Sequence, residues 1–214
     1  MYDNIILTDC DGVLLNWQKG FANWMIKHGF EPVVDNPAEI YHANEIFGIS
    51  REESKLYVKM FNESAHIAYL NPLRDAMYYI DMLHRRHGYV FHVISSVTDD
   101  EIAGRLRIQN LENIFGTSVF ERYTFLACGA DKDEALEEYA KSGYYFIEDK
   151  LENAMLPQKH NYNIKPILMA HNYNKDSDGS IPRFQNWEGV YNHITGSGQF
   201  TNLTGVGLPG APYV

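Results

Sequence analysis

Five short runs of apolar, β-branched and aromatic residues alternate along the chain with segments of helical periodicity. Most of the runs are almost continuously apolar, which is typical of strands that are covered on both faces. Strands that alternate with helices predict an α/β fold with a doubly wound, parallel, five-stranded sheet, whose ligands bind at the carboxyl ends of the strands. The expected strands are Asn4 to Thr8, Tyr89 to Ile94, Tyr123 to Ala127, Tyr144 to Ile147 and Lys165 to Ala170.

Local signals set the boundaries of three expected helices. A helix over Leu73 to His87 should begin after Asn71-Pro72 and end at Gly88, because asparagine caps helices, proline suits the first turn and glycine follows the last. Thr98 to Glu101 and Asp131 to Glu134 have the spacing of a capping box. We therefore expect one helix to start at each of these two sites.

The segment from Trp17 to Asn71 breaks the alternation, because it carries only helical signals and loops. A segment of this length without a strand, between the first and second strands, predicts an inserted helical cap. Its helices are expected over Trp17 to His28, Pro37 to Phe47 and Arg51 to Asn62. The resulting parts are a core over residues 1–16 and 72–194, a cap over 17–71, and a glycine-rich tail over 195–214.

Charge and cysteine content exclude several classes of protein. Lys and Arg total 18 against 28 Asp and Glu, a formal charge of -10, so a positive footprint for a nucleic-acid polymer is missing. No apolar stretch approaches the roughly 20 residues of a membrane span, and no signal peptide is expected at the N-terminus. Cys10 and Cys128 have neither metal-type spacing nor a disulfide framework. We expect a cytoplasmic protein without a membrane or nucleic-acid partner.

Two aspartates follow the first strand, in the run Thr8-Asp9-Cys10-Asp11-Gly12. Alternate residues of a strand share a face, so Asp9 and Asp11 should point the same way and Cys10 the opposite way. Gly12 would let the backbone turn at the carboxyl edge of the sheet. Two close carboxylates either share a proton or hold a cation. The alternative is a turn in which both aspartates cap loop amides.

Polar residues follow two more of the expected strands. Ser95 and Ser96 end the second strand ahead of a helix, where hydroxyls and helix N–H groups could hold a phosphate, although serines are also ordinary turn residues. Glu148 and Asp149 end the fourth strand, and with the first two aspartates they would form a cation site of hard oxygen ligands. Lys132 is expected in a first helical turn, where a cation opposes the helix dipole. Its side chain is therefore either exposed to solvent or part of a functional site.

These residues, in this order and on these strands, resemble the four motifs of the haloacid dehalogenase (HAD) superfamily. The similarity spans Asn4 to about Ala170 apart from the insertion, and it implies the Rossmann-like fold of that superfamily. It implies a phosphatase in which Asp9 attacks phosphorus to form an aspartyl-phosphate. Asp11 would protonate the leaving oxygen and then activate water. Ser95, with Ser96 beside it, would bind the phosphoryl group, and Lys132 would screen its charge.

The same resemblance implies a bound Mg²⁺, held by the Asp9 carboxylate, the Asp11 backbone carbonyl and Asp149. The fourth motif here is Glu148-Asp149 rather than two aspartates, which leaves open which acid touches the metal; we favour Asp149. Lys141 is a rival to Lys132, but it lies at the far end of the expected helix, away from the carboxyl edge.

The inserted segment corresponds to the C1-type cap of the superfamily, which closes over the site and selects small phosphorylated substrates. Its aromatic residues would form the core of the lid, or one of them would stack on a nucleobase. These aromatics are Trp17, Phe21, Trp24, Tyr41, Phe47, Tyr57 and Phe61. The run through Leu14 and the small cap look most like the 5'(3')-deoxyribonucleotidase branch, which implies nucleoside monophosphates as substrates.

Two other functions remain open at the level of sequence. A receiver-type signalling module also combines acids, a Ser or Thr and a Lys on a doubly wound sheet, but its phosphorylated aspartate ends the third strand, and here that strand ends at Ala127-Cys128. A catalytically slow member of the superfamily that only binds a phosphorylated ligand would carry the same motifs.

Overall fold

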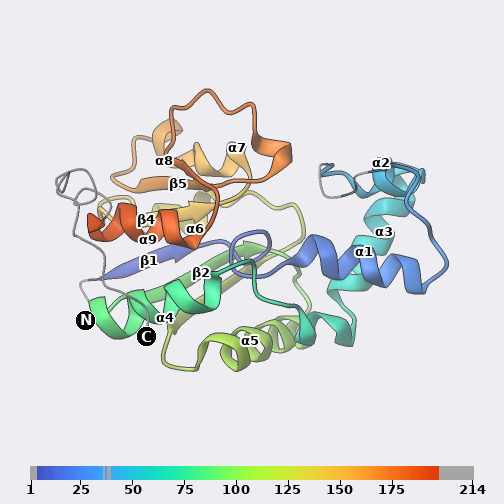
Figure 1. The fold of residues 1–214 in the computed structure, drawn as a ribbon, viewed down its shortest axis with the longest axis horizontal. Coiled ribbons are helices and arrows are strands. Elements are labelled where there is room, and N and C mark those ends of the chain that lie inside the picture. The colour runs from blue at the N-terminus through green and yellow to red at the C-terminus, as the bar shows by residue number, and fades with distance from the viewer. Residues whose placement is uncertain (1–3, 36, 38–39, 198–214) are drawn as a thin grey trace, which may run out of the picture.

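A computed structural model of the chain describes residues 4–35, 37 and 40–197 (Figure 1). Parallel strands form a six-stranded sheet in the order β3-β2-β1-β4-β5-β6. The strands are β1 (Ile5–Thr8), β2 (Val90–Ser96), β3 (Phe120–Leu126), β4 (Tyr145–Glu148), β5 (Lys165–Met169) and β6 (Arg183–Phe184). The expected doubly wound α/β fold is confirmed. The expected number of five strands is wrong by one, because β6 has only two residues and is too short to leave an apolar pattern.

Helices cover both faces of the sheet. Apolar side chains of α4, α5 and α9 pack on one face against Ile6 and Val93, and those of α6 and α8 pack on the other face against Leu7 and Ile94. The helices are α1 (Trp17–Lys27), α2 (Ala43–Phe47), α3 (Arg51–Asn62), α4 (Ala76–His87), α5 (Glu101–Phe115), α6 (Asp133–Glu137), α7 (Leu151–Ala154), α8 (Leu156–Lys159) and α9 (Trp187–Thr195), with 3₁₀ turns η2 (Ala65–Tyr69) and η3 (Asn172–Asn174). Consecutive residues of the central strands β1, β2 and β4 thus point into opposite cores, which explains their continuously apolar runs.

Helices start within both of the expected sites, Thr98 to Glu101 and Asp131 to Glu134, but the residue at the N-cap differs from the expected one. Thr98 does not cap α5, because its hydroxyl accepts the Asp100 amide at 3.0 Å, and the Asp100 carboxylate caps the helix instead at Ala103 N. Lys132, rather than Asp131, is the residue that precedes α6, and it makes no side-chain cap. In both cases the helix begins later than a capping box that starts at Thr98 or Asp131 would place it. The loop between the strand and the helix is longer as a result.

The start of α4 is also later than expected, although its end at Gly88 is as predicted, with a φ of 69°. Leu73 is held outside the helix because its amide donates to Leu14 O at 2.8 Å. The side chain of the N-cap residue Asp75 makes no hydrogen bond to its own helix. Its carboxylate instead accepts the first two amides of α9, from Trp187 and Glu188, at 3.0 Å each.

The segment between β1 and α4 is helical and contains no strand among its described residues (Figure 1). The two connections to it run side by side, because Leu15 forms a bridge with Pro72 and the Asn16 amide donates to Asn71 O at 2.9 Å. Its second helix, α2, is shorter than the expected helix from Pro37. Most of the expected tail, residues 198–214, lies outside the described residues.

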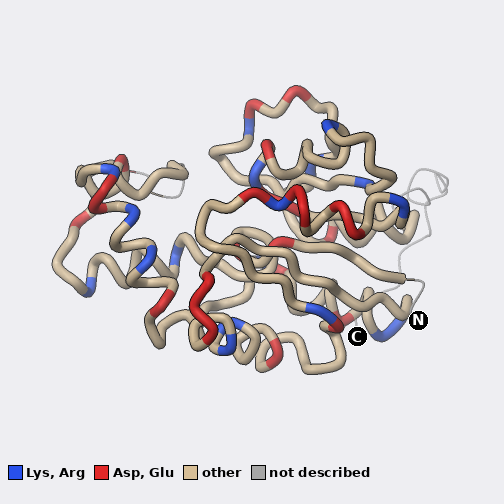
Figure 2. The backbone as a smooth tube through the Cα atoms, turned by 180° about the vertical axis from the view of Figure 1, so that it is seen from behind, with Lys and Arg blue, Asp and Glu red and all other residues tan. Residues whose placement is uncertain are grey.

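Basic residues are spread over several helices and loops, and Figure 2 shows no single element on which they gather. Within the described part of the chain, no helix combines the length and the apolar character that crossing a bilayer requires.

Candidate active site at the carboxyl edge of the sheet

The loop after β1 places two aspartates at the centre of the carboxyl edge. The Asp9 amide donates to Ile147 O of the neighbouring strand at 2.8 Å, and the Leu14 and Leu15 amides both return to Cys10 O at 2.9 Å. Gly12 makes the turn with a φ of 77°, and a Cβ atom there would lie 2.4 Å from Asp149 Oδ2. This position therefore requires glycine for its backbone angle and for the close approach of the loop to β4.

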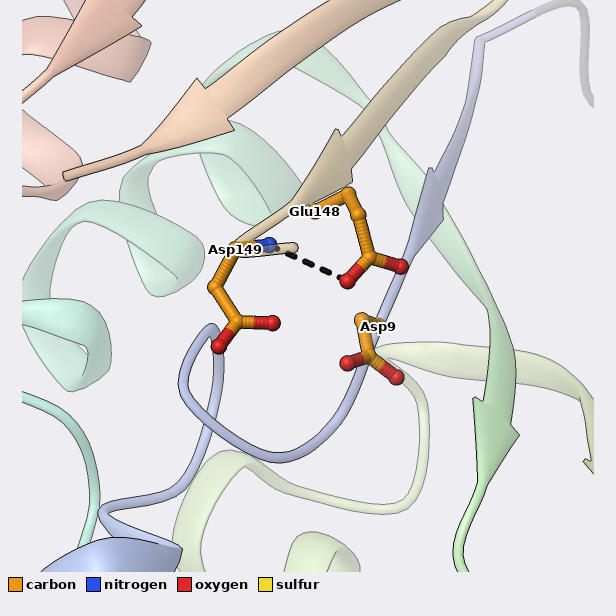
Figure 3. Close-up of side chains that lie close together, drawn as sticks. All are labelled: Asp9, Glu148 and Asp149. Carbon is orange, nitrogen blue, oxygen red and sulfur yellow. Dashed lines mark hydrogen bonds between the residues drawn. The ribbon is translucent and has the colours of Figure 1, made fainter. Parts of the chain in front are cut away.

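Three buried carboxylates meet where β1 and β4 end. One oxygen each of Asp9, Glu148 and Asp149 lies within 4.8 Å of the others (Figure 3), and we call these three residues the acidic cluster. Burial, together with repulsion from the other carboxylates, raises the pKa of Glu148 and that of Asp149 above their ordinary values. A cluster with this much like charge is a candidate site for a cation that prefers oxygen ligands.

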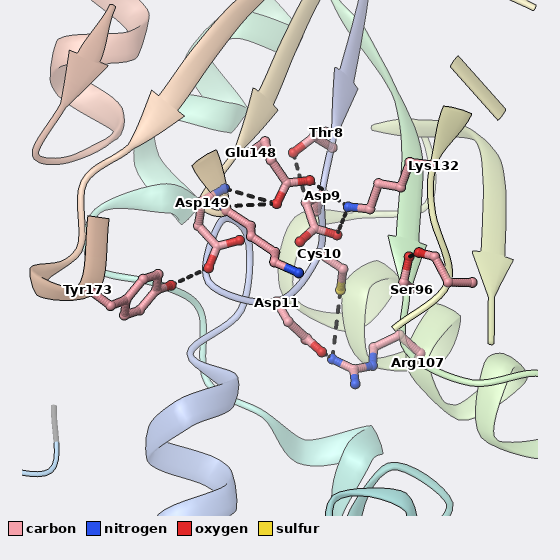
Figure 4. Close-up of polar contacts among 12 residues, drawn as sticks. Thr8, Asp9, Cys10, Asp11, Ser96, Arg107, Lys132, Glu148, Asp149 and Tyr173 are labelled. Atoms are coloured by element: carbon pink, nitrogen blue, oxygen red, sulfur yellow. Dashed lines mark hydrogen bonds and ion pairs between the residues drawn. The ribbon is translucent and has the colours of Figure 1, made fainter. Parts of the chain in front are cut away.

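Lys132 supplies one positive charge to this cluster. Its buried Nζ lies 2.8 Å from Asp9 Oδ1 and 2.6 Å from Glu148 Oε2 (Figure 4). Burial alone would lower the pKa of Lys132, but the two carboxylates raise it above its ordinary value. Lys141, the rival in the sequence, is exposed beyond α6. The side chain of Lys132 thus turns inward from the residue that precedes a helix, where no local signal predicts its direction.

Glu148 and Asp149 have different partners. The second oxygen of Glu148 accepts hydrogen bonds from the amides of Asp149 and Lys150 at 3.2 and 3.1 Å. Both oxygens of Glu148 are therefore bound, one by Lys132 and one by these loop amides. Asp149 accepts a hydrogen bond from the hydroxyl of Tyr173, in η3, and its backbone carbonyl accepts from Asn174 at 2.7 Å. Tyr173 could not be predicted from the sequence, because a single tyrosine beyond the fifth strand matches no motif.

Asp11 lies outside the acidic cluster and pairs with a different cation, Arg107 of α5 (Figure 4). Burial raises the pKa of Asp11 to about 6, against the opposing effect of Arg107. The strand β1 ends at Thr8, so the alternation that would place Asp9 and Asp11 on one face does not extend to Asp11. Arg107 was not predicted, although it lies on the buried face of α5 between Ala103 and Leu111, a position where arginine is unusual.

The two serines at the end of β2 differ in their surroundings. Ser95 is 1% exposed and lines the cavity beside the acidic cluster. The Ser96 hydroxyl donates to Ala130 O at 2.7 Å and so ties β2 to the loop that carries Lys132. The Asp100 carboxylate accepts the Ala103 amide at 2.8 Å, so one N–H group at the start of the next helix is already bound within the chain.

A cavity of about 310 Å³ opens beside these residues. It is lined by residues at the edge of the sheet and by residues of the helical segment between β1 and α4. The sheet side contributes Asp9, Asp11, Ser95, Lys132, Glu148, Asp149 and Asn153, among others. The helical segment contributes Trp17, Gln18, Tyr41, His42, Ala43, Ser54, Val58 and Asn62. Of the seven aromatics expected there, Phe21, Trp24, Phe47 and Phe61 are buried in the helical core, whereas only Trp17 and Tyr41 line the cavity.

Hydrogen bonds connect the helical segment to the edge of the sheet next to the cavity. The Trp17 indole N–H donates to Asn62 Oδ1 at 2.7 Å, and Asn62 Nδ2 donates to Val97 O at 2.9 Å, just beyond β2. Asn110 of α5 donates to Leu70 O at 3.2 Å near the end of the segment. The cavity therefore lies between two parts of the chain that are joined by polar contacts and by the packing of η2 against α5.

Comparison with known proteins supports the fold. No protein-family model matches the chain. A curated protein of Enterobacteria phage T4, described as an uncharacterized 32.4 kDa protein in the Gp30-rIII intergenic region, is 31% identical over 153 residues. The match covers 66% of this chain and 51% of the relative, so the chain spans about half the length of that protein.

Solved structures resemble the whole chain at low sequence identity. A haloacid dehalogenase-like family hydrolase from Streptococcus pneumoniae has a TM-score of 0.61 at 14% identity, covering 91% of this chain and 100% of that one. A HAD-hydrolase from Bacillus subtilis, solved bound to magnesium, has a TM-score of 0.55 at 13% identity, covering 90% and 98%. CbbY from Rhodobacter sphaeroides, solved in complex with phosphate, has a TM-score of 0.53 at 12% identity, covering 87% and 95%. The chain thus has the fold of the haloacid dehalogenase-like hydrolases.

Proposed function

We propose that this chain is a Mg²⁺-dependent phosphomonoester hydrolase that acts through an aspartyl-phosphate on Asp9. The observation that carries the proposal is the buried acidic cluster with Lys132, which lies at the carboxyl edge of the sheet and opens onto a cavity. The fold agrees with this function, since ligands of doubly wound sheets bind at that edge. Similar structures include one bound to magnesium, one in complex with phosphate, and a D,D-heptose 1,7-bisphosphate phosphatase from Burkholderia thailandensis with a TM-score of 0.50.

The acidic cluster suits a divalent cation by its charge. Lys132 is held by Asp9 and Glu148, so one ammonium faces three buried carboxylates and Asp149 has no cation of its own among the described residues. Asp9 and Asp149, with the Asp11 backbone carbonyl that the resemblance implies, would hold Mg²⁺. Such an ion supplies charge that neutralises the phosphoryl oxygens in the transition state.

The residues around Asp9 have the chemistry that phosphoryl transfer needs. A carboxylate oxygen of Asp9 forms a bond to phosphorus as the bond from phosphorus to the ester oxygen breaks, and Asp11 gives its proton to that oxygen. Asp11 then takes a proton from the water that attacks phosphorus, which releases inorganic phosphate and restores the Asp9 carboxylate. Ser95 binds and Lys132 screens the phosphoryl oxygens, because this chemistry depends on positioning and charge neutralisation.

The helical segment, residues 17–71, acts in this proposal as a C1-type cap over the core. Its described side chains along the cavity include amides, hydroxyls and aromatic rings but no Lys, Arg, Asp or Glu. An uncharged polar lining suits a substrate whose remainder is polar and neutral, with its charge on the phosphate. Nucleoside monophosphates fit this description, and Trp17 or Tyr41 would contact the base.

The experiment is a panel of phosphate esters, including nucleoside monophosphates, assayed with and without Mg²⁺. We expect turnover that requires the metal and is abolished in Asp9→Asn. Asp131→Asn is the matched control, because Asp131 lines the same cavity but lies outside the acidic cluster, and it should retain turnover. A fully active Asp9→Asn would contradict the proposal. A stable phosphoprotein would favour a signalling module, and saturable binding without turnover would favour a ligand-binding role.

A further inference from the structure

The most unusual ion pair outside the acidic cluster joins a buried arginine to Asp11. Arg107 lies in the middle of α5, and its side chain is 1% exposed. One terminal nitrogen, Nη1, pairs with the Asp11 carboxylate and lies 3.8 Å from Cys10 Sγ (Figure 4). Its Nε and Nη2 are buried and have no hydrogen-bond partner among the described residues. Because burying a guanidinium is costly, the position calls for an explanation beyond packing.

Arg107 does not contact a substrate in the cavity, since the residues that line the cavity include Asp11 but not Arg107. It meets the site only through the Asp11 carboxylate, which is 20% exposed to the cavity side, and through the neighbouring thiol. Cys10 does not line the cavity, so an effect of Arg107 on the reaction passes through Asp11.

The two aspartates of the loop form ion pairs with two different cations. Lys132 pairs with Asp9 and Glu148, whereas Arg107 pairs with Asp11 from the opposite helix layer. Lys132 is occupied by Asp9 and Glu148, and the Asp9 carboxylate repels Asp11 more strongly than Lys132 attracts it. Without the guanidinium, the Asp11 carboxylate would therefore have no cation among the described residues to hold it in its place beside the cavity.

We propose that Arg107 is a positioning residue that anchors the Asp11 carboxylate in its place beside the cavity, directed at the leaving group. The inference rests on the proposed function. When the ester bond breaks, Asp11 loses its proton to the leaving oxygen, and Arg107 faces the resulting carboxylate. Asp11 regains a proton from the attacking water in the second step, and Arg107 keeps its own protons throughout.

The test compares substrates that need a proton donor with substrates that do not. Arg107→Met should lower kcat on an alkyl phosphate by about 10²-fold, the order of a general acid–base contribution, and kcat on p-nitrophenyl phosphate by less than about 10-fold. The KM of both should stay within about 3-fold, because Arg107 does not touch the substrate. Arg107→Lys should recover most of the kcat on the alkyl phosphate.

The matched control is Arg105→Met on the same helix, because the Arg105 side chain is 76% exposed and pairs with Glu101 one turn away. This variant should leave both substrates unaffected. Equal losses on the two substrates in Arg107→Met, or no loss on either, would overturn the inference.

A second measurement separates this inference from the proposed function. If wild-type protein hydrolyses no phosphate ester, the proposed function fails, and a crystal structure of Arg107→Met then decides the role of Arg107. The Asp11 carboxylate should leave its wild-type place; an unchanged position would overturn the inference. Should Arg107→Met not fold, the crystal structure of Arg107→Lys gives the same decision: Asp11 should stay in its wild-type place, paired with the ammonium at position 107, and a carboxylate that pairs elsewhere would overturn the inference.

Discussion

Replacing Lys132 by methionine removes the one ammonium of the acidic cluster while keeping a side chain of similar length. The Nζ of Lys132 is 2.8 Å from Asp9 and 2.6 Å from Glu148, and the side chains of Lys132 and Glu148 are each 1% exposed. In the absence of a divalent cation, the variant would bury these carboxylates without a cationic partner among the described residues. Such charges cannot be compensated by solvent at this depth.

The expected cost follows from this burial. Removing one partner of a buried ion pair destabilises a protein by about 3–5 kcal/mol. For a chain of this size each kcal/mol corresponds to about 2–4 °C in Tm. Lys132→Met should therefore melt about 6–20 °C below the wild type in EDTA, as followed by circular dichroism.

The loss of Tm in Lys132→Met should become smaller as the pH falls. The pKa values of Glu148 and Asp149 are raised in the folded chain, and loss of Lys132 raises that of Glu148 further. Between the ordinary carboxyl pKa and these raised values, the folded chain binds more protons than the unfolded one, so its stability falls as the pH rises. The gap in Tm between Lys132→Met and wild type should narrow as the pH falls from 7 to about 5.

Two controls make the result interpretable. Lys141→Met removes an exposed lysine nearby and should change Tm by less than about 2 °C, since surface changes cost little. The double variant Lys132→Met/Glu148→Gln removes both charges of the closer pair and should recover part of the loss. A Tm of Lys132→Met equal to that of wild type at pH 7 in EDTA would refute the electrostatic account of the site.

Two further predictions concern the metal and the loop. Mg²⁺ at about 100 times its Kd should stabilise the wild type by about 2.7 kcal/mol, or about 5–11 °C in a thermal-shift assay, and Asp149→Asn should lose most of that shift; an equal shift in both proteins would argue against Asp149 as a ligand. Gly12→Ala should cost about 1–2 kcal/mol in denaturant unfolding for its left-handed backbone, and should also lower kcat, because the added Cβ displaces Asp149; wild-type stability and kcat together would contradict this reading of the loop.

Features that depend on neighbouring residues could be predicted from the sequence. The apolar runs located five of the strands, because the central strands β1, β2 and β4 are buried on both faces and an apolar run is visible without long-range information. The end of β1 with Asp9 and the end of β4 with Glu148 followed from those strands, since the carboxyl ends of parallel strands meet at one edge. The two-residue strand β6 left no pattern, since its place depends on pairing with β5.

Contacts between distant segments could not be predicted in the same way. Arg107 reaches Asp11 from a helix almost a hundred positions along the chain, and Tyr173 reaches Asp149 from a turn beyond β5. The role of Glu148 as the partner of Lys132 depends on the path of the loop before α6, which no capping signal specified correctly. Such partners are set by tertiary packing, so only the three-dimensional arrangement identifies them.

The most direct test of the account is chemical identification of the phosphorylated residue. Wild-type protein mixed with substrate and Mg²⁺, quenched in acid during turnover and reduced with borohydride, should contain homoserine at position 9, because borohydride reduces an acyl phosphate to the alcohol. Peptide mass spectrometry would locate it, with protein quenched in the absence of substrate as the blank. Homoserine at another aspartate, or none while phosphate is being released, would contradict the assignment of Asp9 as the nucleophile.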